Sequence, residues 1–191
     1  MKHYFLTFIF FFSISNLSAQ DAGLKLLIGL SQSEFSSSVY TPDNTSHAGY
    51  QFGFEANLNS GPSYMIASLL YQQDNMIAEG NNEHFDHVYS ISWIKLRSGI
   101  GFRILRFAVL DIHGKVLGAV NAVSDYPQNN NPLSFTDLAP SDLNVVLGLS
   151  VRFSLVFVGA EFEKGLTNMV SEENGSASKY DTFTLRAGIF F

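Results

Sequence analysis

One short polar segment gathers side chains of the kinds that bind metal ions. Glu83, His84, Asp86 and His87 lie within the stretch 83–87. Carboxylates and imidazoles are common metal ligands, and Glu83 and His87 would share a face if this stretch were a strand. The ligand set is incomplete, however, and ligands on a loop without a fixed scaffold bind weakly. We therefore expect a solvated polar loop here and no metal site.

A second candidate for chemistry is His113, which follows Asp111 by two residues. A histidine close to an acid suggests a hydrolase, and an outer-membrane enzyme that acts on lipid is the alternative that this residue supports. No serine stands at a spacing that makes a nucleophile and base pair recognisable from the sequence. We expect no enzymatic activity, and no motif predicts a cofactor.

The most extensive chemical pattern is a set of charged residues that occupy alternate positions of apolar segments. Alternate residues of a strand point to opposite faces of the sheet, so these charges would share one face. We expect Glu55, Glu161 and Glu163 to pair with Lys95, Arg97, Arg152 or Arg186, because an unpaired buried charge costs several kcal/mol. A polar pathway or active site is the alternative to this structural network. The full set is Glu55, Lys95, Arg97, Asp111, His113, Lys115, Arg152, Glu161, Glu163 and Arg186, and Lys25 shares the pattern.

The alternating segments predict eight strands. The clearest is 50–58, where Tyr50, Phe52, Phe54, Ala56 and Leu58 share one face. In the fourth strand, Ile91 and Trp93 have the opposite parity to Ile94 and Leu96, which predicts a bulge near Trp93 that restores the phase. The predicted strands are 24–31, 50–58, 64–73, 87–102, 108–116, 143–153, 156–163 and 183–191. The polar segments 32–47, 74–86, 121–141 and 167–179 are predicted loops.

Long and short connections alternate along the chain, as in an up-and-down membrane barrel with short periplasmic turns and longer extracellular loops. The predicted fold is all-β: an eight-stranded antiparallel up-and-down transmembrane β-barrel with its apolar face toward lipid. A lipocalin-like soluble barrel, with its apolar face inward, is the alternative. Aromatic residues near the strand ends suggest interfacial girdles. They are Tyr50, Tyr64, Tyr71, Phe102, Phe107, Phe153, Phe162 and Phe191.

The start of the chain and its composition indicate where in the cell the protein is located. A basic start, an apolar run at 6–12 and Ser18-Ala19-Gln20 predict a secretory signal peptide over 1–20, which leaves 21–191 as the barrel domain. The sequence contains no cysteine, and its formal net charge of -6 argues against nucleic acid as a partner. We expect the bacterial outer membrane, with both termini periplasmic and with membrane lipid and lipopolysaccharide as partners. The protein partner stays open.

Two segments resemble known outer-membrane proteins. The alternating end of the chain, closing on Phe191, resembles the C-terminal signal of outer-membrane barrels, which implies recognition by the barrel assembly machinery. Phe162 and Gly165-Leu166-Thr167-Asn168 resemble the penultimate strand of the Bacteroidetes outer-membrane β-barrel family, often labelled porin-like or PorT-like. Glu161 departs from that family, which usually has a basic residue there. A shorter stretch, Ser68-Leu69-Leu70-Tyr71, similarly resembles the third strand of that family, with Ser68 where an acid is common.

The resemblance implies a small barrel in a family of mostly unassigned function. We expect a structural or surface-interaction role, with a lumen filled by side chains. An accessory component of a secretion machinery and a narrow pore are further alternatives.

Overall fold

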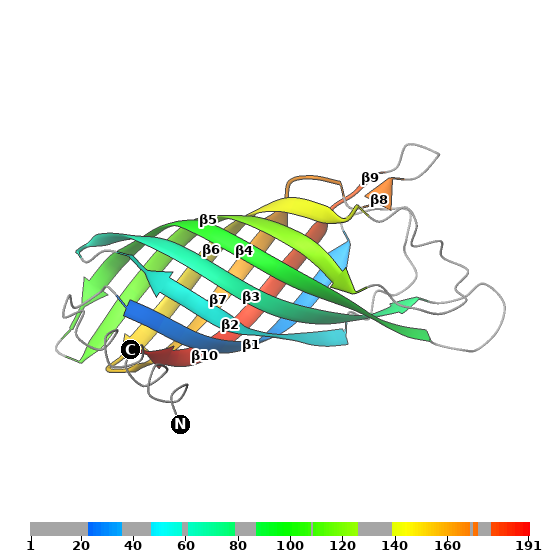
Figure 1. Ribbon diagram of the computed structural model, residues 1–191. Helices are drawn as coiled ribbons and strands as arrows, with labels where there is room; N and C mark the ends of the chain where they lie inside the picture. The colour runs from blue at the N-terminus through cyan, green and yellow to red at the C-terminus, as the bar shows by residue number, and fades with distance from the viewer. Residues whose placement is uncertain are drawn as a thin grey trace, which may run out of the picture.

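A closed barrel of eight antiparallel strands forms the body of the protein (Figure 1). The computed structural model describes residues 23–35, 47–58, 61–78, 87–107, 109–125, 139–168, 170–171 and 177–191. The barrel strands are β1 (Gly23–Phe35), β2 (His47–Asn57), β3 (Ser63–Ala78), β4 (His87–Arg106), β5 (Leu110–Asp125), β6 (Ser141–Phe153), β7 (Val156–Gly165) and β10 (Tyr180–Phe190). Two short strands, β8 (Val170–Ser171) and β9 (Ala177–Ser178), pair with each other separately.

The barrel closes because the first strand pairs with the last. β1 and β10 are antiparallel from Lys25 opposite Phe190 to Phe35 opposite Tyr180. The amide of Phe191 donates to the carbonyl of Leu24 at 2.8 Å. Closure leaves no open sheet edge within the barrel, as a hydrocarbon environment requires. The predicted eight-stranded up-and-down topology is confirmed.

The connections between strands alternate in length, as predicted. At one end β2 is joined to β3, β4 to β5 and β6 to β7 by short links. The start of β1 and the end of β10 lie at this same end, where Figure 1 marks the C-terminus. The other four connections run 36–46, 79–86, 126–140 and 166–179, and the last of these contains β8 and β9. We call the two ends of the barrel the short-turn end and the long-loop end.

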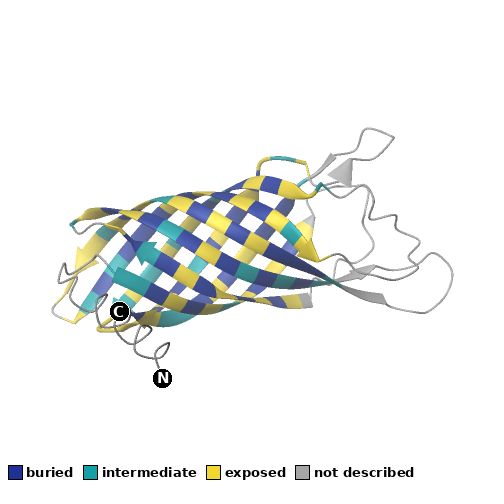
Figure 2. Cartoon of the chain, in the orientation of Figure 1, coloured by how far each residue is buried: buried dark blue, intermediate teal, exposed yellow. Residues whose placement is uncertain are grey.

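The apolar face of the sheet points outward. Phe52, Phe54, Leu147 and Leu149 have relative exposures of 50–55%, whereas Glu55 is 0% exposed. Figure 2 shows the resulting checkerboard, in which exposed and buried residues alternate along each strand. A lipocalin-like barrel would bury the apolar residues instead. The outward orientation that we predicted is confirmed.

Three aromatic and aliphatic residues face the lumen against prediction. Ile91 and Trp93 are each 1% exposed and keep the inward parity of Lys95 and Arg97. The pairing of β3 with β4 is continuous through this region, and the extra residue is Ser124 of β5. A register shift does occur beside Trp93, as predicted, but the extra residue is on β5, so the predicted change of phase within β4 is wrong. Tyr64, predicted in an interfacial girdle, is 3% exposed and also points inward.

Several strands extend further than the polarity of their sequences suggests. β1 continues to Phe35, β3 to Ala78 and β5 to Asp125, into segments that were predicted as loops. Within the described ranges, no helix is long and apolar enough to cross a membrane. The predicted signal peptide, the side chains of the cluster at 83–87 and most residues of the long connections lie outside the described residues.

Candidate functional site: an ion-pair network in the lumen

Two acidic and two basic side chains form a closed ring inside the barrel. Nζ of Lys115 lies 2.6 Å from Oε2 of Glu55, and Lys115 also pairs with Glu161. Nη1 of Arg186 lies 3.0 Å from Oε2 of Glu55 and 2.7 Å from Oε1 of Glu161. Each cation therefore bridges both carboxylates, and each carboxylate contacts both cations. We call these four residues the central ring.

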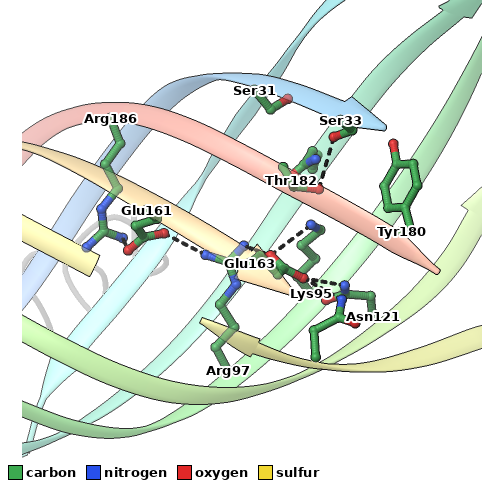
Figure 3. Close-up of polar contacts among 12 residues, drawn as sticks. Ser31, Ser33, Lys95, Arg97, Asn121, Glu161, Glu163, Tyr180, Thr182 and Arg186 are labelled. Carbon is green, nitrogen blue, oxygen red and sulfur yellow. Dashed lines mark hydrogen bonds and ion pairs between the residues drawn. The ribbon is translucent and has the colours of Figure 1, made fainter. Parts of the chain in front are cut away.

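The ring continues into a ladder of further ion pairs toward the long-loop end. Nη1 of Arg97 lies 2.9 Å from Oε2 of Glu161, and its other terminal nitrogen donates to Glu163. Nζ of Lys95 lies 3.1 Å from Oε2 of Glu163. Figure 3 shows this line of contacts from Arg186 through Glu161, Arg97 and Glu163 to Lys95. On the other side of the ring, Nζ of Lys25 lies 2.6 Å from Oε1 of Glu55.

Several of these contacts cross the lumen, whereas Lys25–Glu55 and Arg186–Glu161 join strands that are neighbours in the sheet. Lys115 is on β5 and Glu55 on β2, and β3 and β4 lie between these strands. Arg97 on β4 reaches Glu161 on β7 across the width of β5 and β6. An eight-stranded barrel has an interior just wide enough for side chains. Cross-lumen pairs of this kind fill that interior.

The predicted partners are largely correct, with one exception. Glu55, Glu161 and Glu163 do meet Lys95, Arg97 and Arg186, and Lys115 joins them. Arg152 is the exception, and it pairs with Asp111 at the short-turn end. The reason is the register, since Asp111 on β5 stands directly opposite Arg152 on β6.

His113 also lies at the short-turn end, and its surroundings differ from those of a catalytic histidine. Its Nδ1 forms a 2.9 Å hydrogen bond with the hydroxyl of Tyr64. Its Nε2 lies 3.9 Å from Oδ2 of Asp111. In a serine hydrolase one ring nitrogen of the histidine faces the acid and the other faces the serine. Here tyrosine takes the place of one partner, and Ser150, the cross-strand neighbour of His113, forms no hydrogen bond with it among the contacts described.

A second polar cluster, which the sequence analysis missed, lies near the long-loop end. The carboxylate of Asp74 is 1% exposed and accepts hydrogen bonds from Ser31 at 2.9 Å, Gln72 at 2.7 Å and Tyr180 at 2.7 Å. The rings of Tyr180 and Trp93 pack with their centroids 5.3 Å apart. Asp74 was predicted in a loop, although it keeps the parity of Ser68 and Gln72. Continuation of that parity was the signal available.

The ion-pair network fills the lumen with paired charges. Among the residues that the structure describes, no group of three or more His, Cys, Asp or Glu side chains is placed to hold a metal. Removing one member of a buried ion pair leaves an uncompensated charge and typically costs about 3–5 kcal/mol. In the central ring each side chain has two oppositely charged partners. The arrangement therefore ties distant strands together and blocks the interior.

Comparison with known proteins identifies the fold. No protein-family model matches the chain, and no curated protein matches it. Among solved structures, Neisserial surface protein A (NspA) superposes with a TM-score of 0.52 at 8% identity, over 89% of this chain and 98% of that one. The outer membrane protein OprG of Pseudomonas aeruginosa gives 0.49 at 9% identity, over 91% and 98%. Ail of Yersinia pestis, in complex with the heparin analogue sucrose octasulfate, gives 0.49 at 18% identity, over 89% and 99%.

At 8% identity, the superposition on NspA supports a shared fold and nothing finer. Together with the closed strand order, the outward apolar face and the charged interior, the likeness to NspA gives the class of structure. The chain has the fold of a small eight-stranded outer-membrane β-barrel with a lumen filled by side chains.

Proposed function

We propose that this protein is a small integral protein of the bacterial outer membrane with a structural or surface-interaction role and no conducting pore. The observation that carries the proposal is the central ring, because Lys115 and Arg186 each bridge Glu55 and Glu161 inside the lumen. An ion would have to displace several buried, mutually paired charges to pass. A wide channel needs many more strands.

Conductance across a planar bilayer tests the closed lumen. We expect the native protein to give no current steps, while Glu55→Ala combined with Lys115→Ala opens a small conductance. Glu34→Ala is the matched control, since Glu34 lies exposed on β1 outside the network. Stable current steps from the native protein, unchanged in the double variant, would support the narrow-pore alternative.

The surface-interaction part of the proposal rests on the distribution of the connections. All four long connections are at one end of the barrel, and their sequences are rich in acidic and amide residues. We infer that this end faces the exterior, next to lipopolysaccharide, and that both termini are periplasmic. Insertion of an epitope at 36–46 is expected to give antibody binding on intact cells. An epitope at 107–109 is expected to be detected only after lysis.

We also propose that the protein has no enzymatic activity. The support is the partner of His113, because a hydrogen bond to Tyr64 occupies Nδ1. His113→Ala is expected to leave the lipid composition of the outer membrane unchanged. An altered lipid A profile in that variant would favour the outer-membrane lipid enzyme.

Kinship with the Bacteroidetes PorT-like family and assembly through the C-terminus remain part of the proposal. The support is the motif at Phe162 and 165–168 and the terminal Phe191, which is exposed and pairs with Leu24 through its backbone. Phe191→Ala is expected to slow insertion by the barrel assembly machinery without changing the stability of the folded protein. Cross-linking in intact cells is the test for a secretion partner.

A further inference from the structure

A group of buried oxygen atoms without hydrogen-bond donors lies at the long-loop end of the lumen. Asn121 on β5 stands directly opposite Asp142 on β6, and Asn144 is two residues further along β6 on the same face. Their exposures are 1%, 2% and 3%. Oδ1 of Asn121, Oδ1 of Asn144 and both carboxylate oxygens of Asp142 have no hydrogen-bond partner among the described residues. We call these three residues the Asp142 cluster.

Glu163 determines which way the two amides point. Nδ2 of Asn121 and Nδ2 of Asn144 both donate to Oε1 of Glu163. Figure 3 shows the contact from Asn121. Reversing either amide would place a carbonyl oxygen against the carboxylate of Glu163 and lose a charge-assisted hydrogen bond. The amide nitrogens are therefore committed to Glu163, and the amide oxygens remain as acceptors.

Asp142 differs from the other carboxylates in the lumen. Glu55, Glu161, Glu163 and Asp111 each contact a cation, and Asp74 accepts several hydrogen bonds. The two asparagine side chains and Lys95 lie near Asp142. The amides of Asn121 and Asn144 approach the carboxylate, but neither carboxylate oxygen has a donor at hydrogen-bond geometry among the described residues. Lys95 makes its ion pair with Glu163 at 3.1 Å. A buried acceptor without a donor typically costs about 1–3 kcal/mol, and more when it is charged.

We propose that the Asp142 cluster binds a hard metal cation of the calcium type. Carboxylate and amide carbonyl oxygens are the ligands that Ca²⁺ prefers, and Ca²⁺ tolerates irregular coordination. The cluster offers four such oxygens and no imidazole or thiolate, which a zinc or copper site would use. The bound ion satisfies the four acceptors together. It also adds a countercharge to that of Lys95, whose ion pair is with Glu163.

The position of the cluster suits an ion that arrives from the long-loop end. Asp142 is the second residue of β6, which begins at Ser141. Trp93 and Lys95 are successive inward-facing residues of β4, and Lys95 stands opposite Asn121 of the cluster. Trp93 is the only tryptophan in the chain, so it is a built-in optical reporter for this site.

Terbium luminescence tests the proposal on the full-length folded protein in detergent. Tb³⁺ is a luminescent substitute for Ca²⁺, and its emission rises when a nearby excited tryptophan transfers energy to it. We expect saturable emission on excitation of Trp93, displaced by Ca²⁺ at roughly millimolar concentration or below. Asp142→Asn keeps the shape of the side chain and removes its charge, and we expect terbium binding about tenfold weaker or more.

Asp125→Asn is the matched control, because Asp125 is an exposed aspartate at the end of β5. We expect this variant to bind terbium as the native protein does. Should Asp142→Asn fail to give the heat-modifiable gel shift of a folded barrel, Asn144→Ser tests the same site. Emission that is absent, or that Asp142→Asn and Asn144→Ser both leave unchanged, would overturn the proposal and assign any terbium binding to exposed carboxylates. The assay does not depend on the cellular role proposed above.

Discussion

Lys115 on β5 reaches across the interior of the barrel to Glu55 on β2, with 2.6 Å between Nζ and Oε2, although β3 and β4 separate the two strands. This pair shares its partners with Arg186 and Glu161 in the central ring. The ring therefore links β2 and β5 to each other and to the neighbouring pair β7 and β10 through side chains. Backbone pairing holds neighbouring strands together, and the ring adds contacts between strands that are not neighbours.

The first prediction concerns Glu55, a carboxylate with three cationic partners. Glu55→Gln leaves Lys25, Lys115 and Arg186 without their shared anion, because all three contact Glu55. We expect a loss of about 3–5 kcal/mol in the free energy of unfolding. Denaturant unfolding in detergent or vesicles is the measurement. Glu34→Gln, at an exposed position of β1, should change stability by less than about 0.5 kcal/mol. Equal effects of the two variants would contradict the account.

A second prediction compares a buried pair with a pair at the rim. Lys95→Met and Glu163→Leu are expected to be strongly non-additive, with a coupling energy of about 1–3 kcal/mol, because the two side chains contact each other away from solvent. Lys164 pairs with Asp181, but the Lys164 side chain is 51% exposed. A double-mutant cycle of Lys164 and Asp181 should give a coupling energy below about 1 kcal/mol. A larger coupling at the rim than in the lumen would be inconsistent with the structure.

The third prediction compares Gly148, which lies against lumen side chains, with Gly118, which is exposed. A Cβ added at Gly148 would lie 2.8 Å from Cε of Lys115 and 3.2 Å from Cγ of Glu161. Because both neighbours are held in the central ring, we expect Gly148→Ala to cost about 1–3 kcal/mol through overpacking. At Gly118 the nearest atom would be 3.9 Å away. Gly118→Ala should be close to neutral, and thermal unfolding of both variants provides the comparison.

The outward face and the strand count could be predicted because alternation is a local property of the chain. Leu147 and Leu149 share a parity in the sequence and an environment in the structure. The strand ends were harder to predict, because inside a barrel a polar residue can be buried. Asp74 and Asn121 look like loop residues, yet both are 1% exposed and face the lumen.

The partners inside the lumen depend on geometry that no local pattern contains. Arg152 and Arg186 have the same parity and charge, but only Arg186 lies at the level of Glu55 and Glu161. That level is set by the register of eight strands around a closed barrel. The same limit applies to Trp93. From the sequence, an apolar residue at an inward position suggested that a bulge changes the phase of the strand. In the structure Trp93 packs against the ring of Tyr180 inside the lumen.

The lipid-facing surface leads to the fourth prediction. Leu147, 53% exposed on β6, stands opposite Val116 and Phe162 in a continuous apolar band. Leu147→Arg is expected to destabilise the protein by about 2–4 kcal/mol in a bilayer, because a charge on the lipid face near the midplane is costly. Phe107→Arg, at the short-turn end, should cost about 0–1 kcal/mol. Unfolding experiments in vesicles measure the cost of both substitutions. A larger cost for Phe107→Arg than for Leu147→Arg would contradict the placement of the hydrocarbon region around Leu147.

Quenching of tryptophan fluorescence by phospholipids with brominated acyl chains tests the orientation of the sheet most directly. Trp93 is 1% exposed and faces the lumen, whereas Phe52 is 50% exposed. The two residues are close in the register of the sheet, because Gln51, which precedes Phe52, pairs with Gln72, and Gln72 pairs with Trp93. We predict weak quenching of the native protein and strong quenching when Trp93→Phe is combined with Phe52→Trp. Strong quenching of native Trp93, with weak quenching of the exchanged protein, would contradict the account.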